Sequence, residues 1–168
     1  MTVFYCKTDS PIGVLTLTSD GHSLTGLFME NHKGFSETGS AWLFDEFVEP
    51  FEQTKAELTA YFAGQLKEFT VPLSASGTDF QMRVWSELRN IPFGEVISYA
   101  ELARRIDNPK ACRAVGLANG LNPISIIVPC HRVIGANGRL TGYGGGLPRK
   151  EKLLNHERPN VVRQLSLV

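Results

Sequence analysis

The chain has 168 residues, enough for one large or two small domains, and its 42% hydrophobic content is ordinary for a globular protein. No run approaches the ~18 apolar residues of a membrane span, and no basic stretch precedes an apolar signal region, so we expect a cytoplasmic protein. The formal net charge is zero, but residues 1–78 hold 4 basic and 10 acidic residues, whereas residues 79–168 hold 13 and 7. The basic second half is therefore the candidate for binding a polyanion.

The first sixty residues have the pattern of a small α/β unit. Three β-rich segments separated by turn residues predict antiparallel hairpins at 3–6, 14–18 and 24–29. A polar loop is expected at 31–40, and apolar residues at helical spacing predict a helix over 51–62. Pro72 and the Ser/Ala/Gly cluster that follows it predict a linker at about 71–77. The predicted domains are therefore 1–77 and 78–168.

The second half begins with helical signals. Thr78 with Gln81, and Ser98 with Glu101, have the spacing of capping boxes and predict two helix starts. A third helix is expected over 111–118, with Pro109 in its first turn. The last two helices, joined by a tight turn, are a helix-turn-helix candidate, although the same spacing occurs in ordinary helical packing.

Arg113 is the one long polar side chain in the helix predicted over 111–118. The small residues around it would let the backbone approach a duplex closely, with Arg113 projecting into the DNA. The alternative is a helix that packs through its small residues and leaves Arg113 in solvent. The positive charge of this half favours nucleic acid.

A thiol beside an imidazole makes Cys130-His131 the first place to look for chemistry. A neighbouring imidazole or cation usually promotes deprotonation of a thiol, and His131 and Arg132 supply one of each. In a regular strand the two neighbours would point to opposite faces, so a water bridge or a local turn is required, and Pro129 makes a turn plausible. The alternative is a buried structural thiol, the commonest fate of a free cysteine.

Further along the chain the signals are weaker. The glycine-rich loop 141–146 could offer backbone N–H groups to a ligand, but it lacks the ending of a phosphate-binding loop. A short helix with a basic first half is expected over 148–156, and Glu157 by itself is typical of a solvated carboxylate at a helix end. Residues 161–168 are expected to pack on the core, the alternative being that they help neighbouring molecules to cluster on DNA.

Taken together, these motifs resemble the O6-alkylguanine-DNA alkyltransferase family. The resemblance covers residues 78–157 and is carried, in family order, by Phe93-Gly94-Glu95-Val96-Ile97-Ser98-Tyr99, Arg113-Ala114-Val115-Gly116, Asn122-Pro123, Pro129-Cys130-His131-Arg132-Val133, Tyr143-Gly144-Gly145-Gly146-Leu147 and His156-Glu157. Residues 9–13 resemble the start of the family's variable domain. The implied fold is a two-domain α/β (α+β) protein. It has an RNase H-like N-terminal domain with an antiparallel sheet and a mainly helical, winged-helix-like, helix-turn-helix C-terminal domain.

The resemblance also implies a reaction and its residues. Cys130 would take the alkyl group from O6 of guanine, and from O4-alkylthymine, irreversibly and once per protein molecule. His131 would accept the thiol proton through a water, and Glu157 would hold His131. Tyr99 would protonate the leaving guanine, and Asn122 would tie the recognition helix to the active-site segment.

The implied DNA contacts lie on two helices. The base would be flipped out of the duplex, with Arg113 filling the vacated stack and the helix docked in the minor groove. Other contacts would come from Ala114, Gly116, Ser98 and Tyr99. The base pocket would be lined by Val133, Tyr143, Gly144, Gly145 and Ser125.

The chain departs from the family pattern in three places. Some members have proline where this chain has Ser125 and serine where it has Gly144, so only a backbone N–H is available at 144 to bind guanine O6. Some members bind zinc in the N-terminal domain, but Cys6, His22 and His32 form no convincing ligand set, so neither metal nor cofactor is predicted. Cys112 stands where alanine is commoner, as an alanine substitute or as a second alkylatable thiol.

Two other functions compete with alkyl transfer. A binding-only lesion sensor or transcription regulator would use the helix-turn-helix without chemistry, and a thiol hydrolase would turn over many times. The expected partner is double-stranded DNA containing O6-alkylguanine. We expect no membrane association, a monomer in solution and clustering of neighbouring molecules on DNA.

Overall fold

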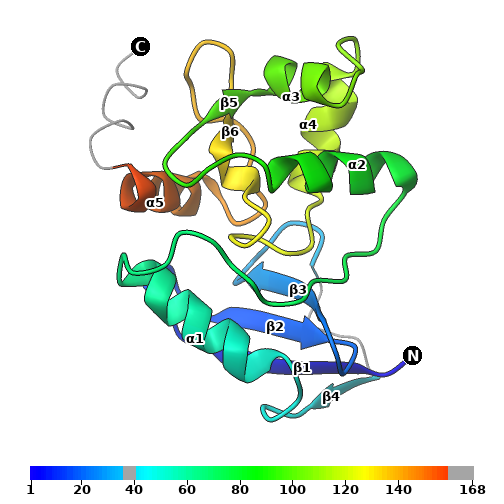
Figure 1. The fold of residues 1–168 in the computed structure, drawn as a ribbon, viewed down its shortest axis with the longest axis vertical. Coiled ribbons are helices and arrows are strands. Elements are labelled where there is room, and N and C mark those ends of the chain that lie inside the picture. Colours follow the sequence, from blue (N-terminus) through cyan, green and yellow to red (C-terminus); the bar gives the residue numbers. More distant parts are fainter. Residues whose placement is uncertain (36–40, 159–168) are drawn as a thin grey trace. The chain divides into compact units, whose positions relative to one another are not determined.

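The computed structural model describes residues 1–35 and 41–158, and the chain divides into two units between Ser76 and Gly77 (Figure 1). The predicted domain boundary lies one residue from this division. The predicted packing of residues 161–168 and the end of the predicted loop at 31–40 lie outside the described residues. Within the described ranges, no helix has the length and apolar character needed to cross a membrane.

A four-stranded sheet forms the first unit together with one helix (Figure 1). Its strands have the order β3-β2-β1-β4 and are β1 (Val3–Thr8), β2 (Leu15–Ser19), β3 (Leu24–Met29) and β4 (Trp42–Phe44). The predicted antiparallel pairing holds for β1 with β2 and for β2 with β3, but β4 pairs parallel to β1. The sheet is therefore mixed, and the antiparallel prediction is wrong at this edge. The connection after β3 carries the chain back to the start of β1, where Val3 pairs with Trp42.

The helix predicted over 51–62 is α1 (Phe51–Phe62). It buries Phe51, Leu58 and Tyr61, and Leu15 and Leu17 of β2 are also buried in this unit. The fixed spacing of these side chains explains why the sequence pattern predicted this helix correctly.

The segment predicted as a linker is partly built into the first unit. Val71 is buried, and Leu73 forms a parallel bridge with Leu24 at the start of β3. The N–H of Leu24 donates to the Pro72 carbonyl at 2.8 Å, and the N–H of Ser74 donates to Leu24 at 2.9 Å. A proline can occupy this edge because its carbonyl still accepts a hydrogen bond, so the flexible linker is shorter than predicted.

Helices dominate the second unit. The first is α2 (Asp79–Leu88), where Thr78 and Gln81 form the predicted capping box. After β5 (Ile97–Ser98) comes α3 (Tyr99–Arg105), and the Ser98 hydroxyl accepts the Glu101 N–H at 3.1 Å, which is one half of the predicted capping box. The Glu101 carboxylate binds Arg104 and Arg105 along the same helix.

The second helix of the predicted helix-turn-helix is α4 (Cys112–Gly120). It begins one residue later than predicted, so Pro109 lies in the turn before it rather than in its first turn. The Trp85 indole N–H donates to the Ala118 carbonyl at 2.8 Å, which fixes α2 against the end of α4. Val115, Ala118 and Asn119 are buried, so α4 has one face in the unit and another in solvent.

The chain then reaches the candidate site. The buried run 124–128 leads into a single 3₁₀ turn, η1 (Cys130–Arg132), which is followed by β6 (Val133–Ile134). β6 pairs parallel with β5, and α5 (Leu147–Glu157) closes the unit. Cys130 and His131 therefore lie on a turn, which is one of the two arrangements that the geometric argument from sequence allowed.

Candidate active site

Two buried asparagines hold the segment that carries Cys130. The Asn122 side-chain amide donates to the Val128 carbonyl at 2.8 Å, and its oxygen accepts the Ile124 N–H at 3.0 Å. The Asn119 amide donates to the carbonyl of Cys130 itself at 3.3 Å. Since Asn119 lies on α4 and Asn122 follows it, the candidate recognition helix and the thiol segment are tied together.

The backbone before Cys130 is strained. Ile126 is buried and has a φ of 71°, in the left-handed region that a β-branched residue rarely adopts. Such conformations persist only where the surroundings impose them, and they concentrate at functional sites. The hydrogen bonds that the Asn122 side chain makes with the backbone of Ile124 and Val128, on either side of Ile126, supply that constraint.

The thiol of Cys130 is only 4% exposed. Burial raises its pKa, while the Asn122 side chain and the Lys150 charge act in the opposite direction and only partly offset this effect. The expectation that the neighbouring cation Arg132 would help to ionise the thiol is not met, because a carboxylate engages that cation. Cys130 therefore rests as a protonated thiol and needs a base to become a nucleophile.

His131, the neighbour of Cys130 in the sequence, is the candidate base and is fully buried. His131 Nε2 lies 2.7 Å from Glu157 Oε1, and its Nδ1 has no hydrogen-bond partner among the described residues. Burial lowers the pKa of His131 more than the Glu157 charge raises it. The imidazole is therefore neutral at pH 7, with Nε2–H donating to the carboxylate and Nδ1 left as the acceptor.

Glu157 is held by more groups than the sequence indicated. Arg132 Nε donates to Oε2 at 2.8 Å and its second terminal nitrogen donates to Oε1 at 2.8 Å, while the remaining terminal nitrogen donates to the Ile91 carbonyl at 2.6 Å. Burial alone would raise the pKa of Glu157, but the charges and hydrogen bonds of His131 and Arg132 hold it well below its usual range. Glu157 is therefore an ionised, buried carboxylate, and the interpretation as a solvated helix end is wrong.

Replacing Arg132 should destabilise the fold, because the buried Glu157 carboxylate would lose its charged partner. We expect Arg132→Met to lower the free energy of unfolding by about 3–5 kcal/mol, because it leaves one member of a buried ion pair without its partner. Urea unfolding at pH 7 would measure the loss, with Arg89→Met at the exposed end of α2 as a control expected to change little. Equal stability of the two variants would contradict the ion-pair role.

Lys150 is a site residue that the sequence analysis missed. It is completely buried, and its ammonium group donates to the carbonyls of Val133 at 2.6 Å and Thr141 at 2.8 Å. Burial lowers its pKa to about 8, and it still carries its charge at neutral pH. The available signal was its position three, four and seven residues before Leu153, Leu154 and Glu157, on the buried face of α5.

Tyr99 is placed at the same loop. Its hydroxyl donates to the Thr141 carbonyl at 3.2 Å from the first residue of α3, directly after the cap residue Ser98. Burial raises the pKa of Tyr99, so the phenol keeps its proton and can act as a donor. Lys150 and Tyr99 thus bind the same carbonyl from two helices and hold the loop beside β6.

Three of the residues expected to line a base pocket, Tyr143, Gly144 and Gly145, belong to this loop, and Lys150 links the loop to a fourth, Val133. Val133, Tyr143, Gly145 and Ser125 are buried, and Gly144 is half-buried. The Ser125 hydroxyl has no hydrogen-bond partner among the described residues. Among the predicted DNA contacts, Arg113 and Ala114 on α4 are exposed, and Gly116 on α4 is half-buried, as are Ser98 and Tyr99 at the start of α3.

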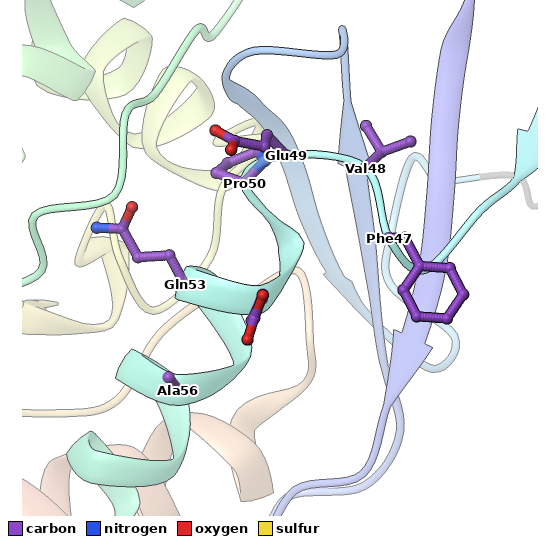
Figure 2. A pocket seen from close by; sticks show the side chains of 7 residues that line it. Phe47, Val48, Glu49, Pro50, Gln53 and Ala56 are labelled. Carbon is purple, nitrogen blue, oxygen red and sulfur yellow. The ribbon is translucent and has the colours of Figure 1, made fainter.

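A separate cavity lies in the first unit (Figure 2). It has a volume of about 360 Å³ and is lined at the start of α1 by Phe47, Val48, Glu49, Pro50, Glu52, Gln53 and Ala56. Its lining offers carboxylates but neither a thiol nor an imidazole. Within residues 1–35 and 41–158, no cluster of three or more His, Cys, Asp and Glu side chains is arranged to hold a metal ion.

Comparisons with known proteins match most of the chain. Residues 79–159 match the family model described as 6-O-methylguanine DNA methyltransferase, DNA binding domain. Residues 3–75 match its ribonuclease-like domain. These matches support the two-part α/β architecture, with the DNA-binding part second.

Relatives of similar length share about half of the sequence. The methylated-DNA–protein-cysteine methyltransferase of Mycobacterium bovis is 52% identical over 165 residues, which are 98% of each chain. That of Methanosarcina acetivorans is 50% identical and covers 92% of this chain and 98% of its own. The crystal structure of Mycobacterium tuberculosis OGT in complex with DNA superposes with a TM-score of 0.84 at 53% identity, covering 94% of this chain and 93% of that one. The chain belongs to the 6-O-methylguanine DNA methyltransferase family.

Proposed function

We propose that Cys130 accepts the alkyl group of O6-alkylguanine in double-stranded DNA. Family membership makes the chain a DNA-repair methyltransferase that reverses damage directly, with DNA as its partner. The observation that carries the choice of nucleophile is the buried Cys130 thiol next to an imidazole that Glu157 holds at 2.7 Å. A binding-only sensor would need neither the thiol nor the buried carboxylate.

The proton of Cys130 is the first to move. Glu157 accepts the hydrogen on Nε2, so Nδ1 of His131 presents a lone pair and takes the thiol proton through a bridging water. The imidazolium that forms lies against an ionised carboxylate, which stabilises its charge. Burial keeps Cys130 protonated at rest, so the thiolate forms only when a substrate fills the site.

The alkyl group is then transferred from O6 of guanine to the sulfur of Cys130. The sulfur bonds to the alkyl carbon as the carbon–O6 bond breaks, and the electron pair of that bond stays on the guanine. Tyr99 donates its hydroxyl proton to a guanine ring nitrogen and recovers one from the imidazolium, so one thiol proton ends on the base. The thioether has no leaving group at neutral pH, so each protein molecule reacts once.

The reacting base must leave the duplex to reach Cys130. Extrusion costs a few kcal/mol, and Arg113 on the exposed side of α4 fills the space in the stack. Ala114 and Gly116 are small and allow close approach, while Ser98 and Tyr99 begin the neighbouring helix. Asn122 links this docking surface to the thiol segment through Val128.

The extruded base enters the pocket of Val133, Tyr143, Gly144, Gly145 and Ser125. The backbone N–H at Gly144 binds O6, and the same pocket accepts O4-alkylthymine. The protein acts as a monomer that clusters with its neighbours on DNA. Its free thiols suit a reducing compartment, which supports a cytoplasmic location.

Stoichiometry separates this function from a hydrolase and from a sensor. A duplex with one O6-methylguanine, in tenfold excess over protein, should lose one lesion per protein molecule and no more. Repair beyond one equivalent would indicate hydrolytic turnover, and bound but unrepaired DNA would indicate a sensor. Chromatography of the digested DNA measures the lesions that remain.

A further inference from the structure

The exposed face of α4 is apolar apart from one arginine. At about 100° of rotation per residue, Leu117 lies at the centre of the exposed arc. Arg113 and Gly120 lie on one side of it, and Ala114 and Leu121 on the other. Leu117 is 68% exposed and Leu121 47%.

A single exposed leucine on a protein surface is ordinary. Here two neighbouring leucines share a face with Arg113, and the opposite face of α4 is buried in its own unit through Val115 and Ala118. The leucines are therefore part of the surface that α4 presents, and that surface belongs to the DNA-binding part of the chain.

The charge of this arc limits what it can bind. Arg113 is its one cation, so ion pairs with phosphates cannot hold most of the face against DNA. Proteins that enter the minor groove commonly use apolar side chains there, where the sugars present apolar edges. Ala114 and Gly120 are too small to project, which leaves Leu117 as the side chain that reaches furthest.

We propose that Leu117 packs against the deoxyribose walls of the minor groove and supplies the apolar part of duplex binding. The proposal rests on the proposed function, in which α4 docks with Arg113 in the vacated stack. Leu117 lies one helical turn from Arg113, about 6 Å along the axis, or roughly two base steps from the extruded nucleotide. It anchors α4 while Arg113 occupies the gap.

Leu117→Ala tests this contact because alanine keeps the helix and removes only apolar surface. We expect binding to an undamaged duplex to weaken about fivefold to tenfold, with an unchanged slope of log affinity against log salt concentration. Loss of a phosphate contact would instead reduce that slope by about 1. Leu117→Gln, which keeps the length but adds polarity, should show the same loss.

Leu43→Ala is the matched control, since Leu43 is 53% exposed on β4 in the other unit. It should bind DNA as the parent protein does. Parent-like binding by both Leu117 variants, or a weaker salt dependence, would overturn the proposal. Reaction with the free base O6-benzylguanine should be equal in all variants, and if the parent protein fails this reaction, the proposed function fails rather than the role of Leu117.

Discussion

Cys130→Ser should abolish alkyl transfer and leave DNA binding intact. A hydroxyl is a far weaker nucleophile than a thiolate, and the buried His131 has too little basicity to ionise it, so we expect a loss of at least about 10³-fold. Affinity for an undamaged duplex should stay within about twofold, because Cys130 is buried and α4 presents the DNA-binding face. Single-turnover repair assays and a binding titration on the same preparation measure both properties.

The exposed thiol of Cys112 provides the control for this experiment. Cys112 is the first residue of α4 and is exposed, and Cys112→Ala should still repair one lesion per molecule. Residual transfer in Cys130→Ser that disappears in the double variant would make Cys112 a second acceptor. Full transfer in Cys130→Ser alone would contradict the assignment of the nucleophile.

Arg113→Ala should separate base extrusion from chemistry. The variant loses the side chain that fills the space left by the flipped base. The cost of unstacking that base, a few kcal/mol, is then not offset, so repair in a duplex should fall roughly 10²-fold. Reaction with free O6-benzylguanine needs no extrusion and should change less than about twofold. The ratio of the two rate constants is the quantity to compare with the parent protein.

Arg113→Lys distinguishes the shape of the side chain from its charge. Lysine keeps the positive charge but lacks the planar group that stacks between bases, so it should recover binding affinity more than repair. Equal losses on the duplex and on the free base would contradict the extrusion role of Arg113 and indicate damage to the site itself.

Local sequence signals predicted most of the helices. Thr78 with Gln81 marks the start of α2 because the capping box depends only on residues three apart. The apolar spacing over 51–62 similarly predicted α1. Strand β4 was missed because Trp42–Phe44 is too short to show a period, and its parallel pairing with β1 depends on where a long connection returns.

The sequence allowed the main site residues to be predicted, but not the hydrogen bonds and ion pairs that surround them. The resemblance to the family singled out Cys130, His131 and Glu157, and the structure brings the last two within 2.7 Å. Arg132 and Lys150 were not expected to be buried, because charged residues are rarely buried. Their partners also give no local signal, since Arg132 binds Glu157, 25 residues away, and Lys150 binds the backbone carbonyl of Val133. Only the tertiary fold brings those groups together.

Intact-protein mass spectrometry after reaction with a duplex containing one O6-methylguanine tests the central claim most directly. The proposed chemistry predicts a gain of one methyl group, about 14 Da by mass arithmetic, that saturates at one per molecule and maps to the peptide containing Cys130. An unchanged mass with the lesion intact and the DNA still bound would contradict it, and would leave Cys130 as a structural thiol in a DNA-binding protein.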